Sequence, residues 1–251
     1  MINLWFTRAT LKRQSADVAP LLGTLLTDDD GGRQLDTTHR LLWTLLPDEF
    51  QRAGKPDRDG QDKAAFLWRR APDKEGEPVW YVLGPEPREE CAFFHVESKP
   101  WQPALAPGDR LSFDLLVNAT VDRMIEPGKG RNGRKRVDVV MDAMVARERG
   151  GVADDRAVLR REAGAEAMRG WWEKQAGRNG FRALATELAD YRTVPLSGKR
   201  LGARKGPQLG ISRLTGIAEV SDPAAFLNRV AIGFGRAKAF GCGLMLLKRA
   251  S

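Results

Sequence analysis

The segment GFGRAKAFGCGL, residues 233–244, lies near the end of a chain of 251 residues. It carries four glycines and two cations but no acidic residue, namely Gly233, Gly235, Gly241, Gly243, Arg236 and Lys238. The preceding residues DPAAFLNRVAIG predict a helix that Asp222 caps, and the following LMLLKR predicts a strand. The glycines can adopt positive φ angles, and they can allow close backbone contact between this helix and this strand. They can equally let a phosphate group approach exposed N–H groups beside the two cations.

A nucleotide cradle is not the interpretation that this glycine segment favours. A dinucleotide fingerprint lies between a strand and a following helix. Here the predicted helix comes first and the predicted strand follows. The Lys-Ser/Thr pair of a P-loop is also missing.

The positive charge of the chain is concentrated in its last quarter. The net charge of the whole chain is +8. From Tyr191 onward there are eleven basic residues, whereas the only acidic ones are Glu219 and Asp222. Such asymmetry favours a polyanionic partner, because neutralised phosphates release counterions. A solvated basic face explains the charge alone equally well.

Short extended runs alternate with single helical runs along the chain. Strands are predicted at residues 2–11, 64–70, 79–85, 91–100 and 110–121, on both sides of a basic loop at 127–136, and on both sides of a basic turn within 191–220. Helices are predicted at 18–27, 35–46, 154–180 and 222–232. This pattern predicts an α+β fold of two tandem ferredoxin-like (RRM-like) domains with antiparallel sheets. The expected boundaries are residues 1–98, a linker at 99–109, and residues 110–251.

The two cysteines, Cys91 and Cys242, are too few for a disulfide framework and form no metal-binding pattern. We therefore expect reduced thiols, a cytoplasmic protein, and neither metal nor cofactor. No signal peptide or membrane span is expected.

The chain has two histidines, and the one on a predicted helix is the stronger candidate for chemistry. His39 shares the apolar face of its helix with Leu35, Leu42, Trp43 and Leu46. From the residues alone, a core histidine bonded to a backbone carbonyl remains the leading interpretation. His95 lies in an extended run, where it is expected to pack or to face solvent.

Several blocks of the sequence resemble the CasE family, the endoribonucleases of type I-E CRISPR systems. They occur in the family's order along most of the chain: HRLLWTLLPD (39–48), AAFLWRR (64–70), APGDRLSFDLLVN (106–118), WWEKQAGRNGF (171–181) and the glycine segment. The stretch RERGGVADDRAVLRREA (147–163) has no obvious family counterpart.

The resemblance implies a catalytic role for His39. In the family, cleavage is metal-independent: the ribose 2′-OH attacks the adjacent phosphate and the 5′-oxygen leaves. Imidazole suits this reaction because it exchanges protons near neutrality. Many members carry a tyrosine three residues before the histidine, where this chain has Asp36. Asp36 could orient His39 or raise its pKa, but a helix cap by Asp36 or Thr37 is favoured. Pro47 is expected to end that helix.

The resemblance also implies that basic segments bind RNA. A hairpin within residues 197–213 is expected to contact the repeat stem through Lys199, Arg200, Arg204, Lys205 and Arg213. The loop at 127–136 adds Lys129, Arg131, Arg134, Lys135 and Arg136, for which a solvated loop is an equal alternative. The glycine segment completes the expected surface.

The expected partners are therefore the stem-loop of the precursor CRISPR RNA repeat, the mature CRISPR RNA and other subunits of the Cascade complex, with no membrane. Two alternatives stay open. One is a non-catalytic subunit that only binds the RNA hairpin, which the Asp36 substitution suggests. The other is a basic α+β protein unrelated to RNA.

Overall fold

The computed structural model describes residues 3–12, 31–52, 65–72, 78–124, 126, 133–150, 155–196 and 208–250. Contacts within the chain divide it into two compact units. The first consists of Met1–Ala104, Thr193–Leu209 and Val230–Leu244, and the second of Leu105–Arg192, Gly210–Arg229 and Met245–Ser251. The glycine segment therefore belongs with the first unit, although the sequence analysis placed it in the second domain.

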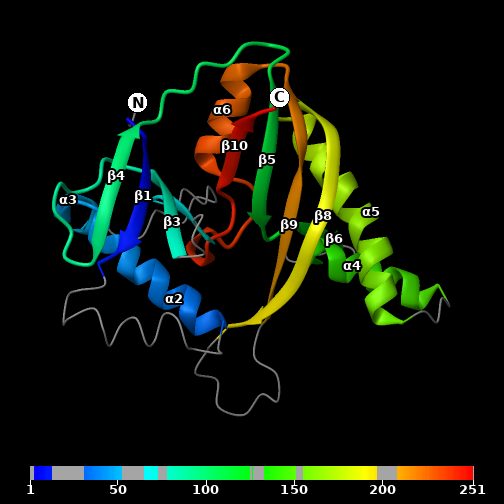
Figure 1. The fold of residues 1–251 in the computed structure, drawn as a ribbon. Helices are drawn as coiled ribbons and strands as arrows, with labels where there is room; N and C mark the ends of the chain where they lie inside the picture. The colour runs from blue at the N-terminus through cyan, green and yellow to red at the C-terminus, as the bar shows by residue number, and fades with distance from the viewer. Residues whose placement is uncertain are drawn as a thin grey trace. The chain divides into compact units, whose positions relative to one another are not determined.

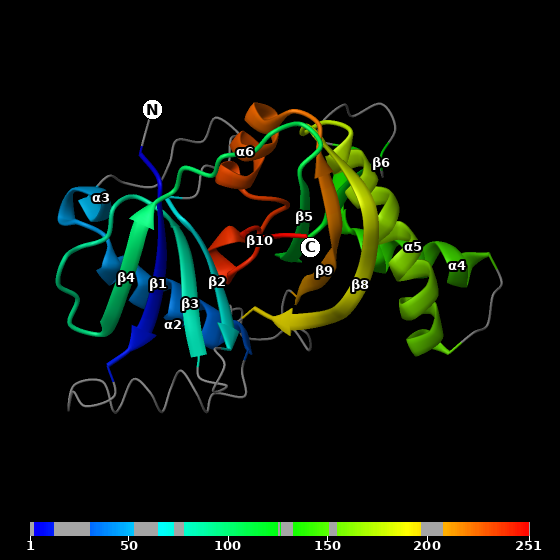
Figure 2. The same ribbon diagram turned by 45° about the horizontal axis from the view of Figure 1, so that its top comes forward.

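The first unit contains a four-stranded sheet with the order β2-β3-β1-β4, of which Figure 1 labels β3, β1 and β4 and Figure 2 labels all four strands. Its strands are β1 (Trp5–Leu11), β2 (Leu67–Pro72), β3 (Pro78–Gly84) and β4 (Phe94–Pro100). Three helical segments follow β1, namely α2 (Gly31–Leu42), the 3-10 turn η1 (Trp43–Leu45) and α3 (Asp48–Arg52). All three neighbouring strand pairs are antiparallel. This strand order is that of a ferredoxin-like unit, except that residues 85–93 form no helix between β3 and β4.

The second unit repeats the same order with β10-β5-β9-β8. Its strands are β5 (Arg110–Val117), β8 (Phe181–Pro195), β9 (Gln208–Val220) and β10 (Met245–Arg249). Two helices connect them, α5 (Arg156–Ala176) and α6 (Pro223–Ile232). An insertion after β5 comprises the hairpin β6 (Thr120–Met124) and β7 (Arg134–Asp138), followed by α4 (Val139–Arg149). The predicted α+β fold with two antiparallel, ferredoxin-like sheets is confirmed.

Each unit has its own apolar core. In the first, α2 lies across one face of the sheet (Figure 2), and Leu42 and Leu45 pack with Trp80, Val82 and Ala9 of the strands. Burial of one such leucine stabilises a fold by about 1.5–3 kcal/mol. The α2 helix is therefore fixed to the sheet by its apolar face, and this contact positions every other side chain on it.

In the second unit both helices cover the same face of the sheet. Phe181 of β8 contacts Trp172 of α5 and Phe226 of α6, with ring centroids 4.9 and 5.3 Å apart. Trp172 also lies 5.0 Å from Phe113 of β5. This aromatic row joins two strands to two helices.

Two local predictions about where helices begin were wrong. The run after residue 136 was expected to be extended, but Asp138 accepts hydrogen bonds from the N–H groups of Val140 and Met141, both at 3.0 Å, and begins α4. Asp36 was expected to cap its helix, but α2 already begins at Gly31, so Asp36 lies inside it. By contrast, Asp222 accepts a hydrogen bond from Ala225 at 3.1 Å at the start of α6, as predicted.

Other expectations concern the cysteines and the membrane. Cys91 and Cys242 are both buried, and neither is part of a disulfide among the described residues. Within the described ranges, no helix combines the length and the hydropathy that a membrane span requires.

Candidate functional site

His39 lies in the last turns of α2, half-buried beside two aromatic rings. Its ring centroid is 5.4 Å from that of Phe66, which directly precedes β2, and 6.1 Å from that of Trp43 in η1. The rings of Trp43 and Phe66 also touch each other edge to face, with centroids 5.3 Å apart. Three rings from three segments thus form one cluster.

Ring contacts are what hold the imidazole. In the part of the chain that the structure describes, no group forms a hydrogen bond with the imidazole of His39, so the expected bond from the ring to a backbone carbonyl is absent there. Burial lowers the pKa of His39 below its ordinary value, because desolvation disfavours the charged ring. The negative charge of Asp36 raises this pKa by a smaller amount, and Arg40 lowers it slightly. The neutral imidazole is therefore favoured.

Asp36 is exposed and forms an ion pair with Arg40, one turn further along α2, at 3.0 Å. Its carboxylate therefore acts on His39 through charge and not through a hydrogen bond. The residue that sequence reasoning missed is Phe66. The only signal for it was its place in the block AAFLWRR, which predicted a strand and no contact with a histidine.

The glycine segment approaches α2 from the other end of the sequence. It contains the 3-10 turn η3 (Lys238–Phe240), which packs against α2 and β2. Gly233 has a φ of +83°, and a Cβ there would lie 2.7 Å from the side chain of Leu67 in β2. Gly243 has a φ of +97°, and its Cβ would lie 2.8 Å from the carbonyl oxygen of Phe234. The predicted positive φ angles are confirmed. The backbone after α6 also contacts the backbone directly before the last strand, because the N–H of Phe234 donates a hydrogen bond to the carbonyl of Gly243 at 3.0 Å, and the segment packs on β2 as well.

The remaining residues of this segment differ in exposure. Arg236 is half-buried, and Lys238 is buried at 9% exposure. Gly235 and Gly241 also have positive φ angles, and Gly241 lies against the ring of Trp68. The structure thus brings the helix of His39 together with the glycine segment in one unit.

The other predicted RNA-binding residues lie elsewhere or outside the described ranges. Arg134, Lys135 and Arg136 are exposed on β7, so these three belong to a strand and not to the expected loop. Arg213 lies on β9 in the second unit, where it donates two hydrogen bonds to Asp114 of β5, at 3.1 and 2.8 Å. Four residues of the basic turn and two of the basic loop lie outside the described residues, namely Lys199, Arg200, Arg204, Lys205, Lys129 and Arg131.

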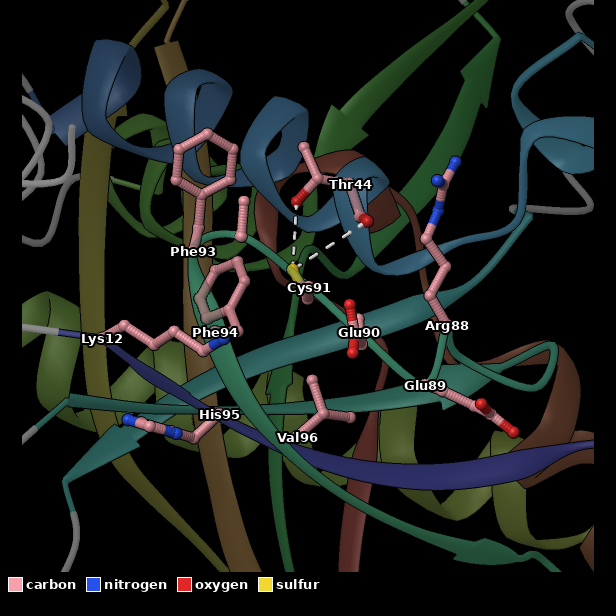
Figure 3. Close-up of a pocket in the computed structure, with 11 residues that line it drawn as sticks. Lys12, Thr44, Arg88, Glu89, Glu90, Cys91, Phe93, Phe94, His95 and Val96 are labelled. Carbon is pink, nitrogen blue, oxygen red and sulfur yellow. Dashed lines mark hydrogen bonds between the residues drawn. The ribbon is translucent and has the colours of Figure 1, made fainter. Parts of the chain in front are cut away.

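A separate pocket of about 840 Å³ surrounds the N-terminal end of β4 (Figure 3). His95, which is exposed, lines it beside Lys12, whereas Arg88 and Glu89 lie on the opposite side. The buried thiol of Cys91 lies 3.7 Å from the hydroxyl of Thr44 at its wall. His39 does not line this pocket. The two histidines therefore do not share this pocket.

No group of three or more His, Cys, Asp or Glu side chains suitable for a metal ion occurs among the residues with described positions.

Comparisons with known proteins agree with these features. The sequence model of a family described as CRISPR associated protein matches residues 4–249. The search of curated proteins found no match.

Solved structures share the fold over nearly the whole chain. CRISPR endoribonuclease Cse3 bound to a 19-nucleotide RNA is 22% identical, with 98% of this chain and 99% of that chain covered and a TM-score of 0.61. Cse3 of Thermus thermophilus, bound to an RNA representing a pre-cleavage complex, is 22% identical over 98% and 100% of the two chains, with a TM-score of 0.60. Cas6e of Escherichia coli str. K-12 is 18% identical over 98% and 100%, with a TM-score of 0.58. The match of the family model over residues 4–249 shows that the chain belongs to the family of CRISPR associated proteins, in agreement with its resemblance to CasE.

Proposed function

We propose that this protein is an endoribonuclease that cleaves precursor CRISPR RNA within the repeat, beside its stem-loop, and then retains the hairpin as a Cascade subunit. The observation that carries the proposal is the arrangement of His39: its helix packs against the glycine segment, in a member of a CRISPR-associated family. Proteins of the same fold are described as endoribonucleases bound to RNA, and one occurs in an RNA-guided surveillance complex.

The chemistry we propose is metal-independent transesterification. The 2′-oxygen of the ribose attacks the adjacent phosphorus, the bond from phosphorus to the 5′-oxygen breaks, and a cyclic phosphate remains. The lowered pKa of His39 keeps its ring neutral near pH 7, so the ring can accept the 2′ proton as a general base. Asp36 is proposed to adjust this pKa by its charge. Cations of the RNA-binding surface would stabilise the negative charge that develops on the phosphate in the transition state.

The RNA surface we propose consists of the basic turn within residues 197–213, the basic loop at residues 127–136 and the glycine segment. Its residues are Lys129, Arg131, Arg134, Lys135, Arg136, Lys199, Arg200, Arg204, Lys205, Arg213, Gly233, Gly235, Arg236, Lys238, Gly241 and Gly243. Within this set Lys238 is buried and Arg213 is already paired with Asp114. Contact with a phosphate would therefore require these two cations to exchange their present neighbours for RNA.

Cleavage of a labelled repeat RNA in buffer with EDTA tests the proposal. The wild-type protein should cut the RNA at one position, and His39→Ala should bind it without cutting. Undiminished cleavage by His39→Ala would remove this residue from the mechanism. Inhibition of the wild-type protein by EDTA would contradict metal independence.

A second candidate function is a subunit that binds the hairpin without cutting it. Asp36 favours this alternative, because it stands where the family has a tyrosine and its carboxylate is engaged by Arg40. The same assay decides between the two functions. Wild-type protein that shifts the RNA on a gel but never cuts it, while Asp36→Tyr does cut it, would support the non-catalytic role.

A further inference from the structure

The cluster of three rings around His39 suggests how a histidine can be oriented without a hydrogen bond. Acid–base histidines are commonly held by a carboxylate or carbonyl that accepts a hydrogen bond from one ring nitrogen. Over the ranges that the structure describes, His39 has no such acceptor, and the nearby carboxylate of Asp36 is paired with Arg40. What contacts the imidazole is the ring of Phe66 on one side and the ring of Trp43 on another.

We propose that Trp43 and Phe66 are positioning residues, which hold the His39 imidazole by ring contact in place of the usual hydrogen-bonded acceptor. This inference rests on the proposed catalytic role of His39. Phe66 is 3% exposed and belongs to the core cluster of the first unit, so its ring is fixed by the packing beneath it. Trp43 touches both other rings and closes the arrangement.

Ring packing against the imidazole and a hydrogen bond to it differ in their effect on the protons of the ring. An acceptor at one nitrogen selects one tautomer, whereas packing restricts the plane of the ring and leaves both nitrogens free to exchange protons. A ring held in this way can take up the 2′ proton at one nitrogen. It can also donate a proton to the leaving 5′-oxygen, so one histidine could serve both steps of the exchange.

The same rings also remove water from the imidazole. Burial is the largest cause of the lowered pKa of His39. The charged groups on its own helix that act on the pKa of His39 are Asp36 and Arg40, while Arg33 lies earlier on α2. The turn η3, which packs on α2, contributes Lys238. Beyond Phe66, the strand β2 contributes Arg69 and Arg70. A variant that removes one ring and none of these charges therefore isolates the contribution of packing.

Phe66→Leu and Phe94→Leu form a matched pair for this test. Both phenylalanines belong to the same core cluster, at 3% and 2% exposure, but Phe94 contacts the ring of Trp80 and not His39. The two variants lose the same aromatic ring from the same core. Only Phe66→Leu loses the contact with the imidazole.

The experiment is an NMR titration of histidine-labelled protein without RNA, combined with single-turnover cleavage of repeat RNA. The chain has two histidines, and His95→Gln assigns their signals. Phe66→Leu should move the midpoint of the His39 titration upward and slow cleavage about tenfold, since small misplacements of a reacting group cost up to about 10²-fold. Phe94→Leu should change neither quantity. Trp43→Phe, which keeps a ring, should retain more activity than Trp43→Leu.

Equal His39 midpoints and equal cleavage rates in Phe66→Leu and Phe94→Leu would overturn the positioning role. If Phe66→Leu does not fold, Trp43→Leu at its half-buried position replaces it in the comparison. The titration needs no activity, so the two proposals fail separately. Undiminished cleavage by His39→Ala refutes the proposed catalytic role of His39, whereas an unmoved His39 midpoint and an unchanged rate in Phe66→Leu refute the positioning role alone.

Discussion

The two histidines of this chain belong to the same unit, but their surroundings differ. His39 is half-buried on a helix, contacts two aromatic rings and has a lowered pKa. His95 is exposed on the strand β4 and lines an open pocket beside Lys12. Their residue type is identical, so burial and neighbouring rings must account for any difference in chemistry. Burial and ring contact therefore distinguish His39, the candidate catalytic residue, from the exposed His95.

The largest expected effect comes from replacing each histidine in turn. His39→Gln should reduce single-turnover cleavage by about 10²–10⁴-fold, because a positioned acid or base contributes that much. His95→Gln should stay within about twofold of the wild-type rate, as expected for a side chain that makes no contact with the reacting atoms. Both variants should bind repeat RNA as the wild-type protein does. Equal losses in the two variants would break the comparison.

A second effect concerns the glycine segment that packs on β2 and carries η3 against α2. Gly233→Ala should destabilise the fold by about 2–4 kcal/mol, from the left-handed backbone and the overlap with Leu67. Gly170→Ala is the matched control, because its Cβ would meet nothing within 4 Å on α5. That change should stabilise the helix by about 0.5–1 kcal/mol. Urea unfolding measures both, and a harmless Gly233→Ala would refute the packing argument.

The charged residues Asp36 and Arg40 on α2 should shift the pKa of His39, with smaller effects than those of the histidine and glycine variants. Asp36→Asn should lower the pKa of His39 further, because it removes a negative charge that favours the protonated ring. Arg40→Gln should raise the pKa of His39, because it removes a neighbouring positive charge. Both shifts should shrink in high salt, since the two side chains are exposed. Shifts of the same sign in the two variants would contradict this account.

The smallest effect on stability and cleavage is expected from removing an ion pair near His95. Arg8 of β1 forms an ion pair with Glu97 of β4 at 3.1 Å, two residues along the strand from His95. Glu97 is 73% exposed, and exposed pairs contribute about 0–1 kcal/mol. Arg8→Gln should therefore leave stability and cleavage nearly unchanged. A marked loss of cleavage would place this face of the sheet in the RNA site.

The sequence predicted most strands of both sheets, because their alternation is local and strong. It missed α4, since Val137, Val139 and Val140 resemble a strand and the decision rests on the single cap at Asp138. It placed the start of α2 too late, because Gly31 and Gly32 normally disfavour a helix. These two errors arise where a side-chain cap or tertiary packing outweighs local preference.

The candidate site could be predicted only in part. The spacing correctly placed Trp43 on the same helical face as His39, because helical periodicity is local. The contacts with Phe66 and with η3 could not be foreseen, since they join segments that are far apart in the sequence. Nor could the sequence predict that the imidazole of His39 has no hydrogen-bond acceptor among the described residues, because this too depends on how distant segments pack.

The most direct test of the central claim is to measure the His39 titration and the pH dependence of single-turnover cleavage on the same wild-type protein. If His39 is the general base, cleavage should fall at acid pH with a midpoint equal to that of the His39 imidazole in the RNA complex. In the free protein, this midpoint should lie below the ordinary histidine value of about 6.5. A cleavage rate that stays constant while the His39 signal titrates would contradict the account.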